Sequence, residues 1–283
     1  MISVMMTTKL LAINDQILSL KDLDFPINDA GFLYGLGVFE TILIHDGKIP
    51  FLVFHYDRLQ KSAEFLSISM PLTLEILQQT LFELIKVSDS QNAKLNLYLT
   101  AGDKDNSQAG FHFTDPKLIS VIRPHSHQET APVSTTLSAL TYTPVPLHCH
   151  KSLSYAPYIL EQKRYAPNTP LLTSPDGFLL ETPTAAVCCI KDKTLLFPKI
   201  DPKCHHYRLR SVSEAVIKHY AKEWGVAVED KSIHRDDLNN MDEIFLCNAV
   251  QGIIPVSSID GDCALRSGTL TETLASEWNK RLF

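Results

Sequence analysis

The chain has 283 residues and a formal net charge of −6, and 45% of its residues are hydrophobic while 20% are charged. These values are typical of an ordinary globular protein with a substantial core. They argue against nucleic acid as the main partner, because binding to phosphates needs clustered lysine and arginine. No run of about 18 apolar residues occurs, so a membrane span is not expected either.

The cysteines of the chain form no CxxC pair and no spacing typical of a zinc site. The first residues lack the apolar segment and cleavage site of a secretory signal. Because unpaired cysteines are typical of a reducing compartment, we expect a cytoplasmic protein without a metal centre.

The first third of the sequence predicts a mixture of strands and helices. Residues 39–44 are rich in β-forming side chains. The Asp46–Gly47 pair that follows favours a hairpin turn, with residues 49–54 as the returning strand. Periodic apolar residues then predict two helices and two strands. These elements cover residues 59–66, 74–84, 94–100 and 117–122.

The rest of the chain predicts a second mixed segment. Residues 124–135 show no periodicity and are the candidate connection between the two segments. Residues 182–198 predict a hairpin, Val212–Trp224 predict an amphipathic helix with Gly225 at its C-terminal cap, and residues 243–250 predict a buried strand. The strands do not alternate regularly with helices, and no GxGxxG or GxxxxGK[ST] motif occurs, so a nucleotide-binding doubly wound sheet is not indicated.

Three charged residues lie where chemistry is conceivable. Lys151 precedes an apolar stretch in which partial desolvation would make its amine nucleophilic, and the alternative, which is the more common one for a lysine, is a solvated surface residue. Glu181 lies between apolar residues, where a cationic group would offset its burial, and the alternative is an exposed strand end. Arg58 has the planar fork that suits phosphate, and the alternative is a surface arginine paired with Asp57 or Glu64.

Residues 205–211 (HHYRLRS) place two histidines and two arginines at the start of the predicted Val212–Trp224 helix. Unpaired N–H groups and the helix dipole favour an anion there. The opposing interpretation is that these basic side chains are merely exposed to solvent. His148 and His150 could bind a metal, but two histidines without a third ligand are a weak indication, and we expect none.

Five segments of the chain, in order, resemble the class-IV aminotransferases, which are pyridoxal 5'-phosphate (PLP) enzymes of fold type IV. The segments are residues 28–42, 55–68, 150–166, 178–198 and 241–261. Five motifs in the right order are far more specific than any one of them. The resemblance implies a two-domain α+β protein similar to D-amino-acid aminotransferase. Its smaller N-terminal domain would cover 1–125, and its larger C-terminal domain, 126–283, would carry the cofactor lysine.

The resemblance also implies roles for single residues. Lys151 matches the lysine that binds PLP as a Schiff base and later moves the substrate proton. Glu181 matches the acid that keeps the ring nitrogen protonated, which makes the ring an electron sink. Arg58 matches the arginine on the cofactor phosphate. Other positions that match the cofactor site are Tyr155, Thr184, Arg208 and Leu209, and positions that match the substrate site are Asn248 and Tyr34.

The segment around Asn248 resembles the 4-amino-4-deoxychorismate lyases, which implies a folate-pathway enzyme that releases pyruvate and 4-aminobenzoate. An aminotransferase for D-amino acids or branched-chain amino acids remains an alternative. A degenerate PLP-binding or non-catalytic dimer is a second alternative, because several substrate arginines of the family are absent. The resemblance further implies a homodimer, with a small-molecule amine as the substrate.

Overall fold

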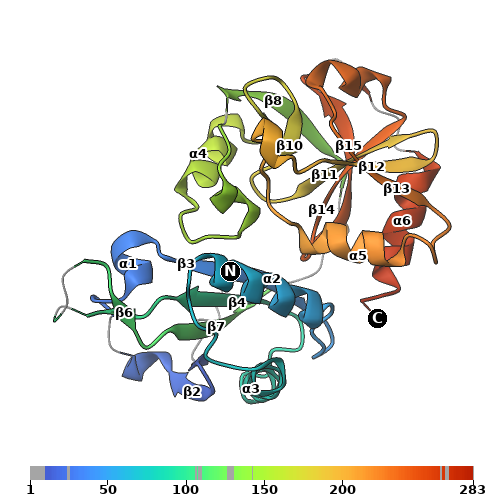
Figure 1. The fold of residues 1–283 in the computed structure, drawn as a ribbon. Helices are drawn as coiled ribbons and strands as arrows, with labels where there is room; N and C mark the ends of the chain where they lie inside the picture. The colour runs from blue at the N-terminus through green and yellow to red at the C-terminus, as the bar shows by residue number, and fades with distance from the viewer. Residues whose placement is uncertain are drawn as a thin grey trace, which may run out of the picture. The chain divides into compact units, whose positions relative to one another are not determined.

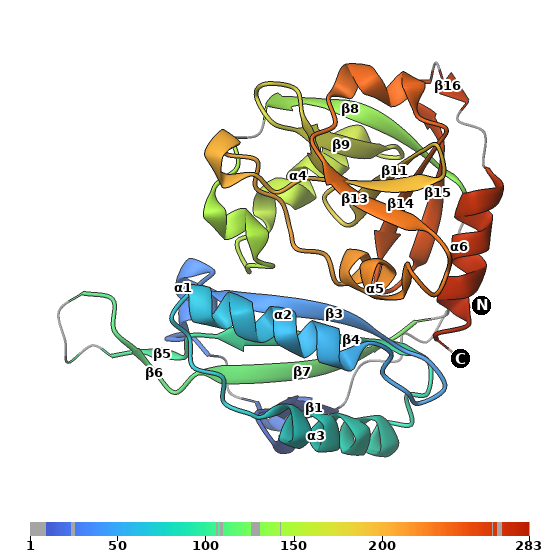
Figure 2. The same ribbon diagram turned by 45° about the vertical axis from the view of Figure 1, so that its right-hand side comes forward.

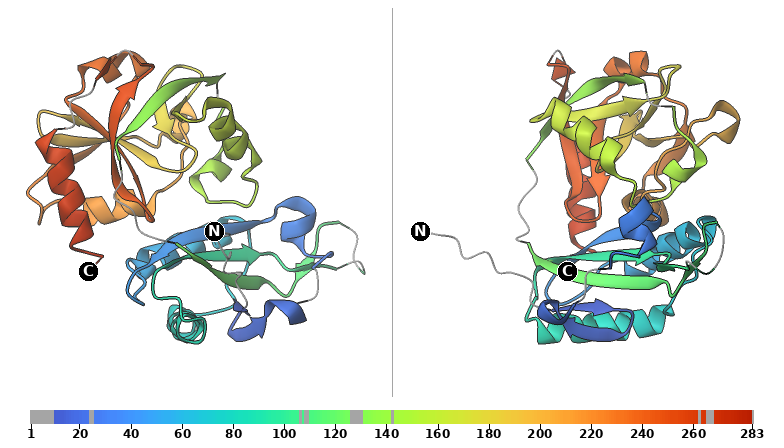
Figure 3. Two further views of the ribbon diagram at one scale, coloured as in Figure 1. Left: turned by 180° about the vertical axis from the view of Figure 1, so that it is seen from behind. Right: turned by 90° about the vertical axis from the view of Figure 1, so that its left-hand side faces the viewer.

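The computed structural model describes most of the chain. The described residues are 10–23, 26–105, 107, 110–125, 131–141, 143–261, 263–264 and 268–282. The chain divides into two compact units: unit 1 comprises Met1–His127 with Lys151–Ser154, and unit 2 comprises Gln128–His150 with Tyr155–Phe283. Figure 1 shows the elements of both units, and Figures 2 and 3 show them from other sides. No helix within the described ranges is long and apolar enough to cross a membrane.

Unit 1 contains a five-stranded sheet in the order β2-β1-β7-β4-β3, in which every neighbouring pair is antiparallel. Its strands are β1 (Leu10–Ile13), β2 (Gln16–Ser19), β3 (Gly37–Ile44), β4 (Ala93–Thr100) and β7 (Lys117–Pro124). A small separate hairpin consists of β5 (Asp103–Lys104) and β6 (Phe113–Thr114). The helices are η1 (Leu20–Asp22), α1 (Ala30–Tyr34), α2 (Leu52–Phe65) and α3 (Leu74–Val87).

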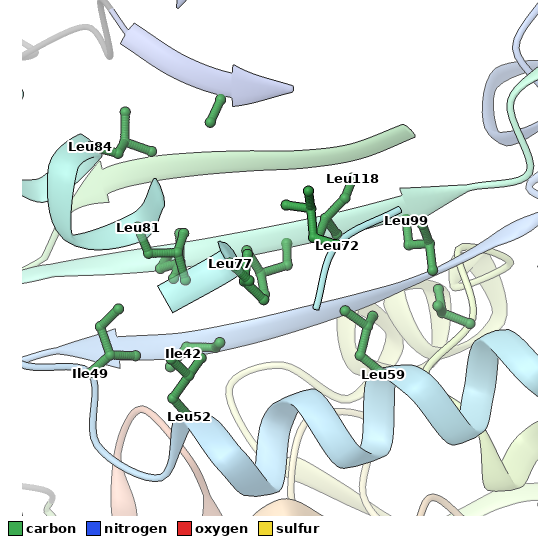
Figure 4. Packing of buried hydrophobic residues seen from close by; sticks show 14 of the residues in the cluster. Ile42, Ile49, Leu52, Leu59, Leu72, Leu77, Leu81, Leu84, Leu99 and Leu118 are labelled. Carbon is green, nitrogen blue, oxygen red and sulfur yellow. The ribbon is translucent and has the colours of Figure 1, made fainter. Parts of the chain in front are cut away.

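The core of unit 1 lies against one face of this sheet. Leu95, Leu97 and Leu99 alternate along β4 and have no exposed surface, as expected for a strand with one buried face. Helices α2 and α3 add apolar side chains such as Leu59 and Leu81 to the same cluster (Figure 4). Both helices are therefore held by the stripe that they bury against the strands.

The predicted Asp46–Gly47 turn is confirmed, because His45 and Lys48 pair across it through their backbone groups, but residues 49–54 do not form a returning strand. Phe51 adopts a left-handed conformation with φ of 60° and caps α2. The helix continues through the predicted apolar stripe, and its buried positions include His55 and Ser62. The polar His55 interrupts the apolar spacing before residue 59, so the apolar pattern does not indicate the first turns of the helix.

The segment Lys151–Ser154 belongs to unit 1, whereas the sequence prediction gave Lys151 to the C-terminal domain. The N–H of Phe39 donates to the carbonyl of Lys151 at 2.8 Å, and the N–H of Leu153 donates to the carbonyl of Gly37 at 2.9 Å. The segment thus pairs with β3, the edge strand of the sheet, whose outer N–H and C=O groups need partners.

Unit 2 contains a nine-stranded sheet in the order β10-β9-β8-β15-β14-β11-β12-β13, and β16 pairs with β15. Parallel pairs (β8–β9, β8–β15 and β12–β13) occur beside antiparallel ones, so the sheet is mixed. Its strands are β8 (Val133–Thr141), β9 (Thr169–Thr173), β10 (Leu179–Glu181), β11 (Ala186–Lys191), β12 (Thr194–Pro198), β13 (Ala227–Lys231), β14 (Glu243–Asn248), β15 (Gly252–Ile259) and β16 (Cys263–Ala264). The helices are η2 (Pro146–Cys149), α4 (Ala156–Tyr165), η3 (Pro202–Cys204), α5 (Val212–Tyr220), η4 (Arg235–Asn240) and α6 (Thr269–Asn279).

The predicted hairpin of unit 2 is confirmed as β11–β12. Its turn residues Asp192 and Lys193 have φ of 48° and 60°, as in the tight turns that suit the twist of a hairpin. The predicted helix is shorter than expected, because α5 ends at Tyr220 rather than at Trp224. Gly225 has φ of 70°, the conformation in which a helical segment commonly terminates.

Candidate functional site

In unit 1 the side chain of Lys151 lies against an aromatic ring. Its Nζ atom is 4.3 Å from the centre of the Phe39 ring, a distance at which the ring attracts a cation. Phe39 in turn stacks on Tyr98 with 6.2 Å between ring centres. The backbone pairing with β3 and this ring contact together orient the lysine.

Arg58 lies in a buried charge network that the sequence analysis missed. Its Nε donates to Oε1 of Glu40 at 2.7 Å, and its Nη2 donates to Oε2 at 2.5 Å, so the pair is bidentate. Nδ1 of His55 lies 2.6 Å from Oε2 of the same carboxylate. Glu40 and His55 are each 1% exposed. The alternative expected for Arg58, a surface pairing with Asp57 or Glu64, is not the arrangement found here.

The charge states of this network follow from its geometry. Burial would raise the pKa of Glu40, but the charge of Arg58 and the hydrogen bond of His55 outweigh it and lower the pKa to about 2. Burial lowers the pKa of His55 more than Glu40 raises it, and the positive charges of Arg58 and Lys151 add to the lowering. His55 is therefore neutral at neutral pH and donates its Nδ1 proton to Glu40. Its Nε2 atom is buried without a hydrogen bond in the described structure.

The sequence carried a signal for Glu40. Alternate residues of β3 face the core, and Val38 and Ile42 are 1% and 0% exposed. Glu40 lies between them in the same alternation, so its carboxylate needs a buried partner. His55 and Arg58 are three residues apart and share one face of a helix, which is the spacing of such a partner set.

Tyr34 lies at the end of α1 and is 46% exposed. Its ring makes edge contacts with Phe111 and Phe113, at 5.5 and 6.1 Å between ring centres. Its hydroxyl accepts a hydrogen bond from Nζ of Lys104 at 3.4 Å. The expected role of Tyr34 toward a substrate stays a prediction.

In unit 2 the carboxylate of Glu181 is buried at the end of β10, with 4% exposure. The hydroxyl of Tyr158 donates to its Oε1 at 3.1 Å. The backbone N–H of Leu209 donates to its Oε2 at 3.2 Å. Each oxygen therefore has a donor, and such bonds favour the ionised form. The exposed strand end that was the alternative for Glu181 is excluded by its burial.

Tyr155 and Thr184 lie beside the turn that follows Glu181. The hydroxyl of Tyr155 donates to the carbonyl of Pro183, and its ring stacks on Tyr158 with 4.8 Å between ring centres. Oγ1 of Thr182 donates to the carbonyl of Ala185 and accepts from its N–H, both at 2.9 Å. Hydrogen bonds between residues of the turn thus stabilise it, and the side chain of Thr184 is exposed.

Arg208, for which the resemblance implies a role at the cofactor, forms a buried ion pair with Glu214. Its side chain is 2% exposed, and its Nη1 and Nη2 atoms lie 2.6 and 3.0 Å from the two carboxylate oxygens of Glu214. At the start of α5, Ser211 accepts the N–H of Glu214 at 3.4 Å. The guanidinium of Arg208 therefore pairs with the acidic group one turn into the helix, and a contact of Arg208 with the cofactor phosphate remains a prediction.

Asn248 supports a turn in the described structure. Its Oδ1 accepts the backbone N–H groups of Val250 and Gln251 at 3.1 and 2.8 Å, and its Nδ2 donates to the side chain of Gln251 at 2.9 Å. The carboxamide fixes the connection between β14 and β15. A contact of this side chain with a substrate remains a prediction.

The HxH sequence does not assemble a metal site in the described residues. Nδ1 of His148 accepts the N–H of Val145 at 2.8 Å, which closes η2. Burial lowers the pKa of His148 and also that of His150, where the charge of Arg210 adds to the effect. Among the residues described, no three His, Cys, Asp or Glu side chains group as metal ligands do.

Comparisons with known proteins give the family. The family model described as amino-transferase class IV matches residues 37–259. A Methanocaldococcus jannaschii protein provisionally named branched-chain-amino-acid aminotransferase is 29% identical over 255 residues, which cover 88% of this chain and 87% of that protein. The aminodeoxychorismate lyase of Bacillus subtilis is 26% identical over 281 residues, covering 95% and 94% of the two chains. The D-alanine aminotransferase of Bacillus licheniformis is 25% identical over 256 residues, covering 88% and 87%.

Solved structures show the same fold at low identity. The branched-chain aminotransferase of Thermoproteus uzoniensis matches with a TM-score of 0.86 at 17% identity, covering 97% of this chain and 95% of that one. The 4-amino-4-deoxychorismate lyase of Pseudomonas aeruginosa matches with a TM-score of 0.81 at 22% identity, covering 96% and 98%. The predicted α+β fold of type IV, with mixed sheets and packed helices, is confirmed. Because the family model spans most of the sequence, the chain is an enzyme of the class-IV aminotransferase family.

Proposed function

We propose that the chain is a PLP-dependent enzyme that moves the proton on the amine-bearing carbon of a small amine, and that it is a 4-amino-4-deoxychorismate lyase. Lys151 is the catalytic and cofactor-binding lysine of this proposal, Glu181 the partner of the ring nitrogen, and Arg58 a partner of the phosphate. The supporting positions are Tyr155, Thr184 and Leu209 toward the cofactor, and Asn248 and Tyr34 toward the substrate.

The residues present fit most parts of PLP. Lys151 supplies a primary amine for the aldehyde carbon, and Glu181 supplies a buried carboxylate for a cationic ring nitrogen. Arg58 and the exposed hydroxyl of Thr184 supply donors for the phosphate. Within the 205–211 loop the fit is weaker, since the guanidinium of Arg208 is paired with Glu214 and the N–H of Leu209 is bonded to Glu181. Arg58 is likewise paired with Glu40, and we keep it as the proposed phosphate partner because its position matches the phosphate arginine of the family.

The observation that carries the proposal is the arrangement around Glu181. A carboxylate with 4% exposure, held by one hydroxyl and one backbone N–H, is fixed in direction and stabilised as an anion. A buried carboxylate that is fixed in this way can pair with a cationic group of a ligand, and the protonated ring nitrogen of PLP would be such a group.

In this proposal each of the residues named above has a separate role in the reaction. PLP, when bound, supplies a ring that draws electrons from the carbon beside the amine. Glu181 holds the proton on the ring nitrogen. Lys151 takes the proton from the amine-bearing carbon, and the Phe39 ring orients its amine. In the lyase reaction this carbon joins the aromatic ring of 4-aminobenzoate without regaining a proton, while the C–O bond to the group released as pyruvate breaks and that group takes up a proton. The bidentate bond to Glu40 fixes the direction in which Arg58 meets an anion.

Two specific reactions share these steps. The lyase is supported by the segment around Asn248 and by the similarity to the Bacillus subtilis lyase over nearly the whole chain. An aminotransferase is the second candidate, and the similarities to the Methanocaldococcus jannaschii and Bacillus licheniformis proteins support it. An aminotransferase must accept a second substrate, a keto acid, whereas a lyase need not.

The cofactor is tested by the near-visible absorption of the purified protein after incubation with PLP. We expect an absorption band that Lys151→Ala loses and that the matched control Lys163→Ala, an exposed lysine on α4, retains. A protein without a band, or a band that Lys151→Ala leaves intact, would contradict the proposal and would favour a non-catalytic dimer.

The reaction is tested by supplying 4-amino-4-deoxychorismate and measuring 4-aminobenzoate by fluorescence and pyruvate in equal amounts. The lyase proposal expects both products without an added keto acid. Multiple turnovers with D- or L-alanine, glutamate or branched-chain amino acids, only when a keto acid is present, would support the aminotransferase instead. We also propose a homodimer, and light scattering should give twice the monomer mass of 31.7 kDa.

A further inference from the structure

In unit 2 a row of charged side chains leads from the sheet edge to the loop that contacts Glu181. Asp230 on β13 lies 2.5 Å from Nζ of Lys218 on α5, and the same Nζ lies 2.7 Å from Oε1 of Glu214. Glu214 binds the guanidinium of Arg208 through both oxygens. The row connects β13, α5 and the loop before α5 by ion pairs.

Arg208 is the point at which this row meets the backbone. Its Nε donates to the carbonyl of Pro198 at the end of β12, at 2.6 Å. Its Nη1 donates to the carbonyl of Leu209 at 3.2 Å. One buried guanidinium thus joins a strand end, a helix start and the loop residue between them. A planar fork with fixed donors can hold such a three-way junction, which a lysine could not.

The opposite side of Leu209 faces the functional carboxylate. The N–H of Leu209 donates to Oε2 of Glu181, while its carbonyl accepts from Arg208. Arg208 therefore fixes the position of Leu209, and the N–H of Leu209 in turn fixes the carboxylate of Glu181. The second donor to Glu181, the hydroxyl of Tyr158, comes from α4 and does not depend on this row.

The row is ionised in the folded protein. Burial would raise the pKa of Glu214, but the charges and hydrogen bonds of Arg208 and Lys218 outweigh it and lower the pKa. Burial would lower the pKa of Arg208, and the charge of Glu214 reverses this effect. Glu214 is 7% exposed, so its negative charge is the main feature that keeps the guanidinium in place.

We infer that Glu214 is a positioning residue for Glu181. It holds Arg208, and Arg208 holds Leu209 so that the Leu209 N–H stays on the Glu181 carboxylate. This inference rests on the proposed function, because it assigns to Glu214 an indirect effect on the cofactor through Glu181. The effect of Glu214 on Glu181 is thus an indirect one, through Arg208 and Leu209.

Two measurements test the inference on the full-length protein, with thermal unfolding as the check that each variant folds. The first is amide hydrogen exchange at Leu209 without added cofactor. The second is the dissociation constant for PLP, measured by absorption, for Glu214→Gln, Glu181→Gln and the double variant. Asp230→Asn is the matched control, since it removes the exposed end of the row and keeps the Arg208–Glu214 pair.

We expect Glu214→Gln to accelerate exchange at Leu209 by about tenfold or more and to weaken PLP binding by about 10-fold, in the range known for residues that support metal ligands. In the Glu181→Gln background the same substitution should have little further effect on PLP binding, because its path runs through Glu181. Asp230→Asn should change neither quantity. If Glu214→Gln does not fold, Lys218→Met replaces it, with smaller shifts in the same two measurements.

Unchanged exchange at Leu209, or losses of PLP affinity that simply add in the double variant, would overturn the inference while leaving the proposed function intact. Failure of the wild-type protein to bind PLP would overturn the proposed function, and the inference with it. The two failures are thus distinguishable.

Discussion

Each unit of the molecule contains a buried, bidentate arginine–glutamate pair, and the two pairs differ in their third member. In unit 1 the Arg58–Glu40 pair is completed by His55, which is neutral and enclosed. In unit 2 the Arg208–Glu214 pair is completed by Lys218, a second cation with 32% side-chain exposure. Glu214 therefore keeps a cation when its arginine is removed, and Glu40 retains only a neutral hydrogen-bond donor in this set. The third partner of such a pair therefore determines how much stability the protein loses when the arginine is removed.

The largest effect is expected for Arg58→Met. It leaves the carboxylate of Glu40 buried beside a neutral histidine, and an uncompensated buried charge costs about 3–5 kcal/mol. We expect a loss of that size in the free energy of unfolding in urea. Lys61→Met, an exposed residue of the same helix, is the control and should stay within about 0.5 kcal/mol. A loss for Arg58→Met no larger than that of the control would contradict the account of this network.

A smaller loss is expected for Arg208→Met, about 1–3 kcal/mol, since Lys218 remains on Glu214 and the lost bonds are those of a charged group. The measurement is again urea unfolding, with the exposed Arg235→Met as the control. The decisive result is the order of the two arginine variants. If Arg208→Met costs as much as Arg58→Met, the second cation does not protect Glu214, and the comparison fails.

The neutral histidine predicts a dependence on pH. The pKa of His55 is lowered in the folded protein, so below its ordinary value of 6.5 the unfolded chain binds more protons than the folded one. Stability is therefore complete above pH 6.5 and falls as the pH decreases, by at most about 1.4 kcal/mol per pH unit for one group. Between pH 7 and pH 5.5 the wild type should therefore lose more stability in urea unfolding than His55→Asn. His219→Asn, at an exposed position, should behave as the wild type.

The smallest effect is expected for Asp230→Asn. Its carboxylate is 52% exposed and pairs only with the outer end of the unit 2 row, so its loss should stay within about 1 kcal/mol. A larger loss in urea unfolding would show that the row depends on its exposed end, and Asp230→Asn could then no longer serve as a neutral control.

The elements that the sequence predicted well are those with an uninterrupted apolar period. β4 alternates leucines without exception, and α3 repeats them every three or four residues, so both were found within a few residues of their bounds. The predicted helix begins seven residues after the start of α2, because the buried face of the first turns includes the polar His55. A periodic search for apolar residues cannot see a helix face that is buried through hydrogen bonds.

The candidate site shows the same limit. The local properties of Lys151, Glu181 and Arg58 also fit surface residues, and only the family resemblance assigns these three residues to a cofactor site. Glu40 was missed, since a carboxylate in a strand is usually solvated, and only its in-phase position between Val38 and Ile42 indicates burial. The pairing of Arg208 with Glu214 could not be predicted, because the sequence does not show that the side chain of Glu214 reaches the guanidinium.

The central claim is that Lys151 binds the cofactor covalently, and borohydride reduction followed by peptide mass mapping tests it most directly. After incubation with PLP and reduction, the account predicts a pyridoxyl phosphate adduct on the peptide that contains Lys151, in an amount proportional to the protein. No other lysine should carry the adduct in a proportional amount. Absence of the adduct from that peptide, or its equal distribution over exposed lysines such as Lys163, would contradict the claim.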